Sequence, residues 1–290
     1  METFFSFLER RVDDCSSLLC VGLDPHVSML PEASAEAALE FSLGLVQETS
    51  AYAAAFKPNA AFFEFFGAQG WDALSELIAA IKAESQKQGS LIPIILDAKR
   101  GDIASTADAY AKSAFDHLGA DCITLNPYLG KDSIEPFINV PEKGAFLLCK
   151  TSNPGASDLQ DILVLNDEER RKTIDDSALF PLSSFEPLYI QVAKKAQRWN
   201  VGNNIGLVVG ATQPEALTNV RAAAPDLWFL SPGVGAQGGN MATALKAGLR
   251  KDGKGMLINV SRSIAKAENP KRAAGELRDE ILQVKSQLNL

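Results

Sequence analysis

The sequence predicts an α/β protein, a single-domain (β/α)8 barrel of the TIM type, and three observations support this prediction. Eight short apolar runs recur along the 290 residues, and each ends in a polar or glycine-rich turn. The runs are continuous rather than alternating, as is typical of strands buried on both faces of a parallel sheet. Segments with helical spacing separate the runs, so strands and helices alternate. The runs are residues 18–24, 53–59, 93–99, 122–126, 144–152, 204–210, 227–233 and 255–262. A doubly wound open sheet is the alternative arrangement of the same elements.

The expected helices follow from apolar residues that share one face. An N-terminal helix carrying Phe4, Phe5 and Leu8 would cap the bottom of the barrel, where the strands begin. Ser34 is a suitable N-cap for a helix that turns Ala38, Phe41, Leu45 and Val46 toward the core. Further helices are expected at residues 71–82, 106–118, 186–199, 214–222 and 242–249.

One long segment interrupts this alternation. Residues 153–185, after the fifth strand, hold seven acidic and three basic side chains and are predicted to be a long acidic loop insertion. Asn166 followed by three acidic residues is typical of a short capped helix. A lid over the active face and a solvated decoration are both open interpretations of this segment. We find no tandem repeat or linker, so residues 1–290 are expected to form one domain.

The overall charge excludes broad classes of partner. Lys and Arg number 28 against 36 Asp and Glu, for a net charge of −8. General binding to nucleic acid or to an acidic membrane needs a basic face, so we expect neither. A small anionic ligand held by a few local charges remains compatible with this balance.

The cysteines and histidines predict neither a disulfide framework nor a metal site. Cys15, Cys20, Cys122 and Cys149 show no C-x-x-C spacing, and His26 and His117 lie far apart. No run has the roughly 18 apolar residues of a membrane span. The N-terminal residues lack the basic and apolar segments of a signal peptide. We therefore expect a cytoplasmic protein with reduced thiols, buried at the three positions that lie in apolar runs.

Charged residues stand where three successive strands end. Asp24 ends the first run, Lys57 lies in the second, Asp97 and Lys99 end the third, and Asp102 follows closely. The chemistry of a barrel is located at the C-terminal ends of its strands. Residues two apart on a strand point to the same face, so Asp97 and Lys99 should project together. Buried charges persist when they are paired, and alternating lysines and aspartates can pair among themselves. Such a group suits stabilising a carbanion and delivering a proton to it.

A separate group of residues suits phosphate binding. The glycine-rich stretch 231–239 follows the seventh run, and residues 261–263 follow the eighth. Glycine lets backbone N–H groups approach an anion, and Gln237 and Arg262 can donate hydrogen bonds to it. These two loops are the usual phosphate site of such barrels. The G-x-G-x-x-G pattern at residues 233–238 is not taken as a dinucleotide fingerprint, because it follows the seventh strand rather than the first.

Residues 96–106, LDAKRGDIAST, resemble the D-x-K-R-x-D-I-x-x-T motif of the orotidine 5′-phosphate decarboxylase family. Further matches follow in the family's order along the chain, so the resemblance covers essentially the whole barrel. They are residues 21–24, 56–59, 151–155, 231–239 and 262–264. The sequence TSNPG at 151–155 resembles the loop that is typical of a bacterial subgroup of this family. The resemblance implies a TIM barrel that decarboxylates orotidine 5′-monophosphate to UMP, the last step of de novo pyrimidine biosynthesis.

The resemblance implies catalytic roles for Lys57, Asp97, Lys99 and Asp102. Lys99 would stabilise the carbanion left at C6 when CO₂ departs and would then protonate it. Asp97 would lie beside the substrate carboxylate, and Lys57 would belong to the charged network. Asp102 would complete this network from the other subunit of a homodimer.

Substrate-binding roles are implied for Asp24, Ser152, Gln237 and Arg262. Asp24 would bind the ribose hydroxyls together with Lys57, and Ser152 would form a hydrogen bond to the pyrimidine. Gln237 and Arg262 would hold the 5′-phosphate.

Ile103 and Thr106 would reach across the dimer interface beside Asp102. The resemblance implies no metal and no organic cofactor.

Three rival functions stay open on the residues alone. An enzyme of the same superfamily acting on a sugar phosphate with Mg²⁺ shares the D-x-K-x-x-D core, although Arg100, Ile103 and Thr106 favour the nucleotide enzyme. A Schiff-base aldolase would need Lys57 or Lys99 uncharged, whereas carboxylates flank both. A catalytically silent sensor of phosphate esters would bind UMP without turnover.

Overall fold

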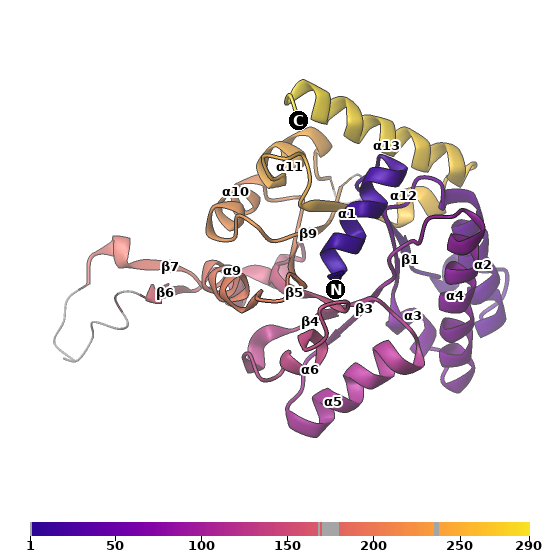
Figure 1. Ribbon diagram of the computed structural model, residues 1–290, viewed down its shortest axis with the longest axis horizontal. Helices are drawn as coiled ribbons and strands as arrows, with labels where there is room; N and C mark the ends of the chain where they lie inside the picture. The colour runs from indigo at the N-terminus through magenta and orange to yellow at the C-terminus, as the bar shows by residue number, and fades with distance from the viewer. Residues whose placement is uncertain (1, 168, 170–179, 235–237) are drawn as a thin grey trace.

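Eight parallel strands form the barrel at the centre of the molecule (Figure 1). The computed structural model describes residues 2–167, 169, 180–234 and 238–290. Neighbouring strands follow the order β2-β1-β10-β9-β8-β5-β4-β3. Their bounds are β1 Leu19–Leu23, β2 Ala55–Pro58, β3 Ile95–Arg100, β4 Cys122–Leu125, β5 Gly144–Lys150, β8 Ile205–Val209, β9 Phe229–Pro232 and β10 Met256–Val260.

The two ends of this strand order meet, and the sheet is closed. Parallel bridges join Phe56 to Ile94 and Asn59 to Asp97, so that β2 lies beside β3. The predicted barrel is therefore confirmed, and the doubly wound open sheet is excluded. Seven of the eight apolar runs contain a whole strand, and the run 93–99 contains all of β3 except its last residue, Arg100. Closure brings the C-terminal ends of all eight strands to one rim.

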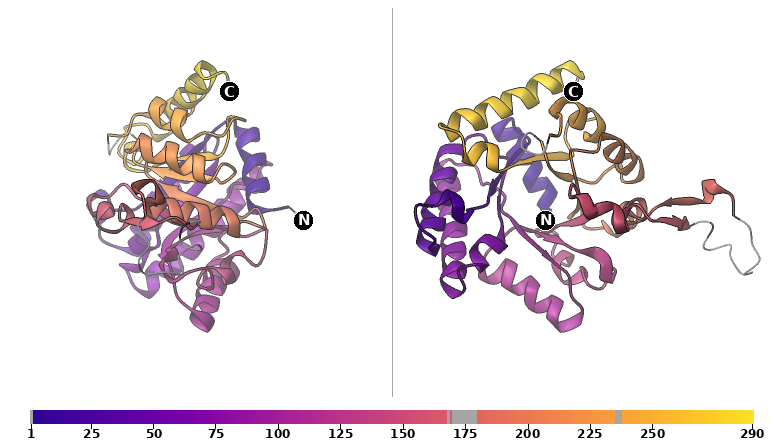
Figure 2. Two further views of the ribbon diagram at one scale, coloured as in Figure 1. Left: turned by 90° about the vertical axis from the view of Figure 1, so that its left-hand side faces the viewer. Right: turned by 180° about the vertical axis from the view of Figure 1, so that it is seen from behind.

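Helices surround the barrel (Figure 2). Their bounds are α2 Ala35–Thr49, α3 Ala60–Glu64, α4 Ala68–Lys87, α5 Ala104–Lys112, α6 Glu135–Ile138, α9 Leu188–Trp199, α10 Pro214–Ala223, α11 Met241–Gly248, α12 Arg262–Ala265 and α13 Pro270–Gln287. Ser34 caps α2 as predicted, because its hydroxyl accepts the N–H of Ala37. The helix expected at 106–118 is α5 followed by a π-helical turn, Ser113–His117. The sequence analysis did not predict α13.

Helix α1 (Phe4–Cys15) covers the end of the barrel where the strands begin, which faces the viewer in Figure 1. A Cβ on Gly144, the first residue of β5, would lie 2.3 Å from the ring of Phe4. The ring of Phe5 stacks on Trp228, with 6.1 Å between the centroids. Phe4, Phe5 and Leu8 are all buried, which confirms the predicted cap.

A buried guanidinium organises the loops at this same end. Arg221 of α10 lies over the ring of Phe229, with its Cζ 3.7 Å from the ring centroid. Its N–H groups donate to the backbone carbonyls of Ala224, Pro225, Leu227, Gly248 and Gly255. One side chain therefore satisfies the carbonyls of several turns.

The segment between β5 and α9 forms an arm that projects from the barrel (Figure 1). It contains the helices Pro154–Ala156, α7 Ser157–Gln160 and Leu182–Ser184, and the hairpin of β6 Leu163–Leu165 with β7 Phe185–Pro187. The predicted 153–185 insertion thus has secondary structure of its own. Asn166 accepts the N–H of Glu169 at 2.9 Å, as expected of a cap.

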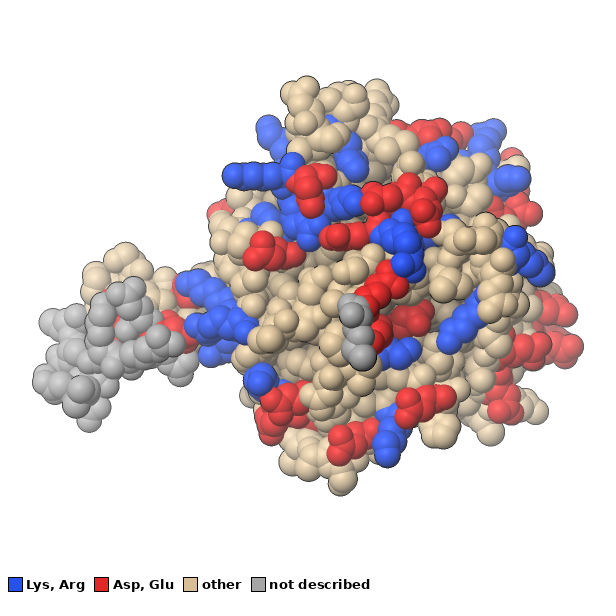
Figure 3. All heavy atoms as spheres, viewed as in Figure 1, with Lys and Arg blue, Asp and Glu red and all other residues tan. Residues whose placement is uncertain are grey.

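Helix α9 holds the root of the arm through ion pairs. Lys194 Nζ lies 2.6 Å from Glu186 Oε2, and Arg198 Nη2 lies 2.5 Å from Asp167 Oδ2. Figure 3 shows basic side chains gathered where the arm leaves the barrel, whereas both signs of charge are interspersed over the rest of this face.

All four cysteines are buried free thiols, whereas burial was expected for the three that lie in apolar runs. Burial raises the pKa of Cys20 to about 12, so this thiol is not ionised at neutral pH. Within the described part of the chain, no helix combines the length and apolar character that crossing a membrane requires.

Candidate active site

Three of the predicted charged residues join at the C-terminal rim of β2 and β3. Lys57 Nζ donates to Asp97 Oδ2 at 2.6 Å, and Lys99 Nζ donates to Asp97 Oδ1 at 2.6 Å. The side chains of Lys57 and Asp97 are 5% and 12% exposed, whereas that of Lys99 is 52% exposed. Asp97 therefore bridges a buried ammonium and one that is open to a ligand.

The charged forms of the buried pair stabilise each other. Burial alone would lower the pKa of Lys57, but Asp97 and then Asp24 outweigh it, and the pKa lies above its ordinary value. Burial alone would raise the pKa of Asp97, but Lys57 and Lys99 outweigh it, and the pKa lies below its ordinary value. Both groups are ionised at neutral pH.

A bulge in β3 shapes this cluster. Leu96 pairs with Ile123 and Arg100 with Leu125, so residues 97–99 face the single residue Thr124 of β4. Lys99 has a φ of +49°, a left-handed conformation that is uncommon for a residue with a side chain. The bulge turns both Asp97 and Lys99 toward the rim.

A cavity of about 360 Å³ opens over the ends of β1, β2, β9 and β10. Among the described residues, three buried oxygens that line it find no hydrogen-bond partner: Asp24 Oδ1, Asn259 Oδ1 and Ser261 Oγ. An unpaired buried polar group costs about 1–3 kcal/mol, so a cluster of them indicates a ligand that supplies the partners. Asn59, which also lines the cavity, pairs with Asp97 across the β2–β3 seam. The cavity and the charged cluster thus adjoin.

Two of the residues predicted for phosphate binding and base recognition, Arg262 and Ser152, lie around this rim. Arg262 begins α12, lines the cavity and is exposed. Ser152 follows β5 and packs against the end of β8. A Cβ added to Gly210, just after β8, would lie 2.9 Å from the Cβ of Ser152. Gln237 lies outside the described residues. The wall of the cavity on the β9 side is formed by Pro232, Gly233 and Val234.

Asp102, Ile103 and Thr106 follow β3, in the connection to α5 and in its first turn. Asp102 Oδ1 accepts the N–H of Ile103 at 2.9 Å. In the part of the chain that the structure describes, no ion pair joins Asp102 to Lys57 or Lys99. Ile103 is 54% exposed, and Thr106 is exposed as well. Of the four charged residues predicted to form one network, Lys57, Asp97 and Lys99 are joined within one chain, and Asp102 is not joined to them.

The end of β5 is tied to the root of the arm. Lys150 is 3% exposed, and its Nζ contacts Asp161 Oδ1 and Oδ2 at 2.7 and 2.8 Å. Gln160 accepts the N–H of Thr151 and donates to its hydroxyl. The loop that carries Ser152 is therefore held from both sides.

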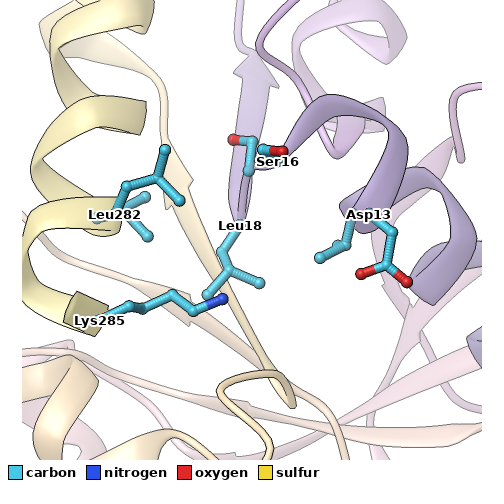
Figure 4. Close-up of a pocket in the computed structure, with 8 residues that line it drawn as sticks. Asp13, Ser16, Leu18, Leu282 and Lys285 are labelled. Carbon is cyan, nitrogen blue, oxygen red and sulfur yellow. The ribbon is translucent and has the colours of Figure 1, made fainter. Parts of the chain in front are cut away.

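A second cavity, of about 200 Å³, lies at the opposite end of the barrel (Figure 4). Lys285 of α13 extends toward Leu18, just before β1, and Asp13 of α1 lies across from them. Asp13 pairs with Lys254, with 2.6 Å between Oδ1 and Nζ. This cavity is far from the strand ends that carry the charged cluster, so it is not the candidate active site.

Metal ligation has no evident place in the described residues, since no three His, Cys, Asp or Glu side chains there are grouped to hold an ion. The sequence analysis missed Thr124 and Asn259, which lie in strands, and Asn59 as a lining residue. Thr124 and Asn259 are polar residues inside apolar runs. A polar residue at a position otherwise suited to an apolar one was the only feature of the sequence that pointed to a role for either.

Comparison with known proteins identifies close relatives. A family model described as orotidine 5′-phosphate decarboxylase / HUMPS family matches residues 17–277. The protein named orotidine 5′-phosphate decarboxylase from Roseiflexus sp. (strain RS-1) is 46% identical over 277 residues, which are 94% of this chain and 92% of the relative.

Solved structures agree with that comparison. The OMP decarboxylase of Leishmania donovani is 50% identical with a TM-score of 0.82, over 98% of this chain and 99% of that one. The UMP synthase of Leishmania donovani is 52% identical with a TM-score of 0.84, over 98% of this chain. The chain spans 57% of the length of that synthase.

Proposed function

The chain belongs to the orotidine 5′-phosphate decarboxylase / HUMPS family, and from this premise we propose how its site residues act. The protein is an enzyme that converts orotidine 5′-monophosphate to UMP in pyrimidine biosynthesis. The observation that carries the proposed mechanism is the bridge from Asp97 to both lysines, 2.6 Å on each side.

Lys99 is the proposed catalytic acid. The bond from C6 to the carboxylate breaks, CO₂ leaves, and the electron pair stays on C6. The ammonium of Lys99 stabilises this charge and then transfers a proton to C6, which gives UMP and a neutral amine that solvent reprotonates. The half-exposed position of Lys99 leaves its ammonium accessible to a substrate at the rim. Asp97 keeps that ammonium oriented, and the buried Lys57 keeps Asp97 ionised.

The rest of the substrate is held at a distance from C6. Asp24, with an unpaired buried oxygen, is the proposed partner of the ribose hydroxyls. Arg262 and Gln237 are the proposed phosphate ligands, and Ser152 is the proposed partner of the pyrimidine. Binding energy from the phosphate aligns the reacting carbon with the ammonium.

A homodimer completes the site in this proposal. Asp102, Ile103 and Thr106 act across the interface, which accounts for the exposure of Ile103 and Thr106 and for the fact that no ion pair joins Asp102 to Lys57 or Lys99 of its own chain. Asp102 of each chain would supply the fourth charge to the partner's cluster.

The ionised state of Lys57 argues against a Schiff-base mechanism at that residue. A Schiff base requires a neutral amine, and the pKa of Lys57 lies above its ordinary value because Asp97 and Asp24 outweigh the effect of burial. Borohydride trapping with a carbonyl substrate would label the enzyme only if a lysine formed such an adduct.

The direct test follows the ultraviolet absorbance of orotidine 5′-phosphate in the presence of EDTA. Substrate loss that matches UMP formation is the expected result, and EDTA should leave the rate unchanged. Binding of UMP without any turnover would instead support the silent sensor. No loss of orotidine 5′-phosphate, together with turnover of a sugar phosphate that EDTA abolishes and Mg²⁺ restores, would support the sugar-phosphate rival.

Shared sites are tested by mixing two inactive variants, Lys99→Ala and Asp102→Ala, under conditions that let subunits exchange. Each mixed dimer then holds one site with both residues intact, so part of the activity should return. No recovery despite demonstrated exchange would refute the contribution of Asp102 across the interface.

A further inference from the structure

The hydroxyl of Thr124 lies at the centre of the β3 bulge, beneath the charged cluster. Thr124 Oγ1 accepts the N–H of Ala98 at 3.1 Å and the N–H of Lys99 at 3.0 Å. It donates to Asp97 Oδ1 at 3.0 Å. Thr124 is 1% exposed, so water does not compete for these bonds.

These three bonds use the full capacity of one hydroxyl. A threonine hydroxyl has one proton and two lone pairs. The N–H groups of Ala98 and Lys99 occupy the two lone pairs, so the single proton must point to Asp97. The direction of this bond is therefore fixed by the backbone of β3 and does not depend on the substrate.

The bulge explains why a side chain is needed at this place. Leu96 and Arg100 keep their pairing with β4, but the three residues between them face one partner. The N–H groups of Ala98 and Lys99 turn to the side chain of Thr124 rather than to a carbonyl of β4. An unsatisfied buried N–H costs about as much as a lost hydrogen bond, so the hydroxyl stabilises the bulge.

The same bonds set both ends of the Asp97–Lys99 pair. The hydroxyl holds one carboxylate oxygen of Asp97, the oxygen that also accepts from Lys99 Nζ. It also holds the backbone of Lys99, whose φ of +49° is strained for a residue with a Cβ. The carboxylate and the lysine backbone thus share one anchor.

We propose that Thr124 is a positioning residue for decarboxylation, which aligns the carboxylate of Asp97 and the ammonium of Lys99 through one hydroxyl. This inference rests on the proposed function, because Lys99 is there the proton donor. Thr124 itself does not touch the substrate in this proposal. Its effect on the rate passes through the geometry of the two charged residues.

The test compares Thr124→Val, which keeps the shape and removes the hydroxyl, with Thr124→Ser, which keeps the hydroxyl. Thr49→Val is the matched control, because the buried hydroxyl of Thr49 donates to the carbonyl of Leu45 within α2, far from the rim. Steady-state decarboxylation, UMP affinity by calorimetry and thermal unfolding are measured for all three variants and for the wild type.

Thr124→Val should lower kcat by about 10- to 100-fold, the range that corresponds to losing a hydrogen bond to a charged group. Its UMP affinity should stay within about threefold of wild type, because the phosphate and ribose contacts lie elsewhere. Thr124→Ser should retain kcat within about fivefold. Thr49→Val should lose stability without losing kcat.

The pH profile gives a readout that a general loss of stability does not move. Removing a donor to the charged form raises the pKa of a carboxyl group. The acid limb of the kcat profile should therefore move to higher pH in Thr124→Val and stay in place in Thr49→Val.

A kcat for Thr124→Val within about threefold of wild type would overturn the inference, as would a Thr124→Ser variant equally impaired. If circular dichroism shows that Thr124→Val does not fold, Thr124→Cys replaces it, because a thiol is a weak donor. Full activity of that variant overturns the inference, and a loss of about tenfold or more supports it. A wild-type protein without decarboxylase activity would refute the proposed function itself, which separates the two failures.

Discussion

The buried pair of Lys57 and Asp97 should show strong energetic coupling in a double-mutant cycle. Asp97→Leu leaves the ammonium of Lys57 buried without its main partner, and the free energy of unfolding should fall by about 3–5 kcal/mol. Lys57→Met leaves Asp97 with Lys99 and the Thr124 hydroxyl, so a smaller loss of about 1–3 kcal/mol is expected. The double variant replaces both charges with apolar groups and should lie within about 1 kcal/mol of wild type. The coupling free energy is then about 3 kcal/mol or more.

Urea denaturation followed by circular dichroism measures the cycle at pH 7. The pair Lys194 and Glu186 is the control, since its atoms also lie 2.6 Å apart but its side chains are 39% and 17% exposed. Coupling of about 0–1 kcal/mol is expected for this more exposed pair. A coupling for Lys57 and Asp97 no larger than that of the control would refute the argument that burial makes their pairing matter.

Acidification provides a second readout of the same pair. The pKa of Asp97 in the folded protein lies below its unfolded value, which is about 3.9. Its contribution to stability is therefore complete well above that value and is lost as the pH falls through it toward the folded pKa. The wild type should lose more stability than the double variant between pH 7 and about pH 3. Equal losses would contradict the assignment of the lowered pKa to this pairing.

Three further predictions concern single side chains. Lys99→Ala should lower kcat by at least about 10³-fold while UMP still binds in calorimetry, because its ammonium acts on C6, and substantial residual turnover would contradict its role. Arg262→Ala should raise KM by about 10- to 100-fold, and a substrate without phosphate should show little further loss in this variant; an undiminished phosphate effect would argue against the assignment. Arg221→Met should lower the free energy of unfolding by at least about 2 kcal/mol in urea titrations, because several buried carbonyls lose their donor, while kcat in the folded fraction stays unchanged.

The barrel was predictable from the sequence because burial on both faces leaves a continuous apolar run at each strand. Helix α13 was not predicted, since only Ala274, Ile281 and Val284 of its 18 residues are buried. The strands β6 and β7 escaped prediction because each has three residues and none of them is buried. Short exposed strands carry neither the length nor the apolar pattern that such a prediction needs.

The charged residues of the site were predictable from their positions at strand ends, but their supports were not. Thr124 interrupts an apolar run by one hydroxyl, and its role depends on a bulge in the neighbouring strand. Hydrophobic periodicity does not encode which strand carries an extra residue. Asn259 was missed for a related reason, because its neighbour Pro232 belongs to another strand, β9, and lies beside it only once the two strands pair.

The two ends of the arm leave the body side by side, since Leu163 pairs with Pro187 at the base of the hairpin. The length of the chain beyond that point therefore does not change the separation of the two ends of the arm where they join the barrel. Each doubling of the length of a flexible connection costs only about 0.6 kcal/mol in closure entropy. We therefore expect this position to accept peptide tags or a whole inserted module in protein engineering, and we expect insertions and deletions there to be nearly neutral during evolution.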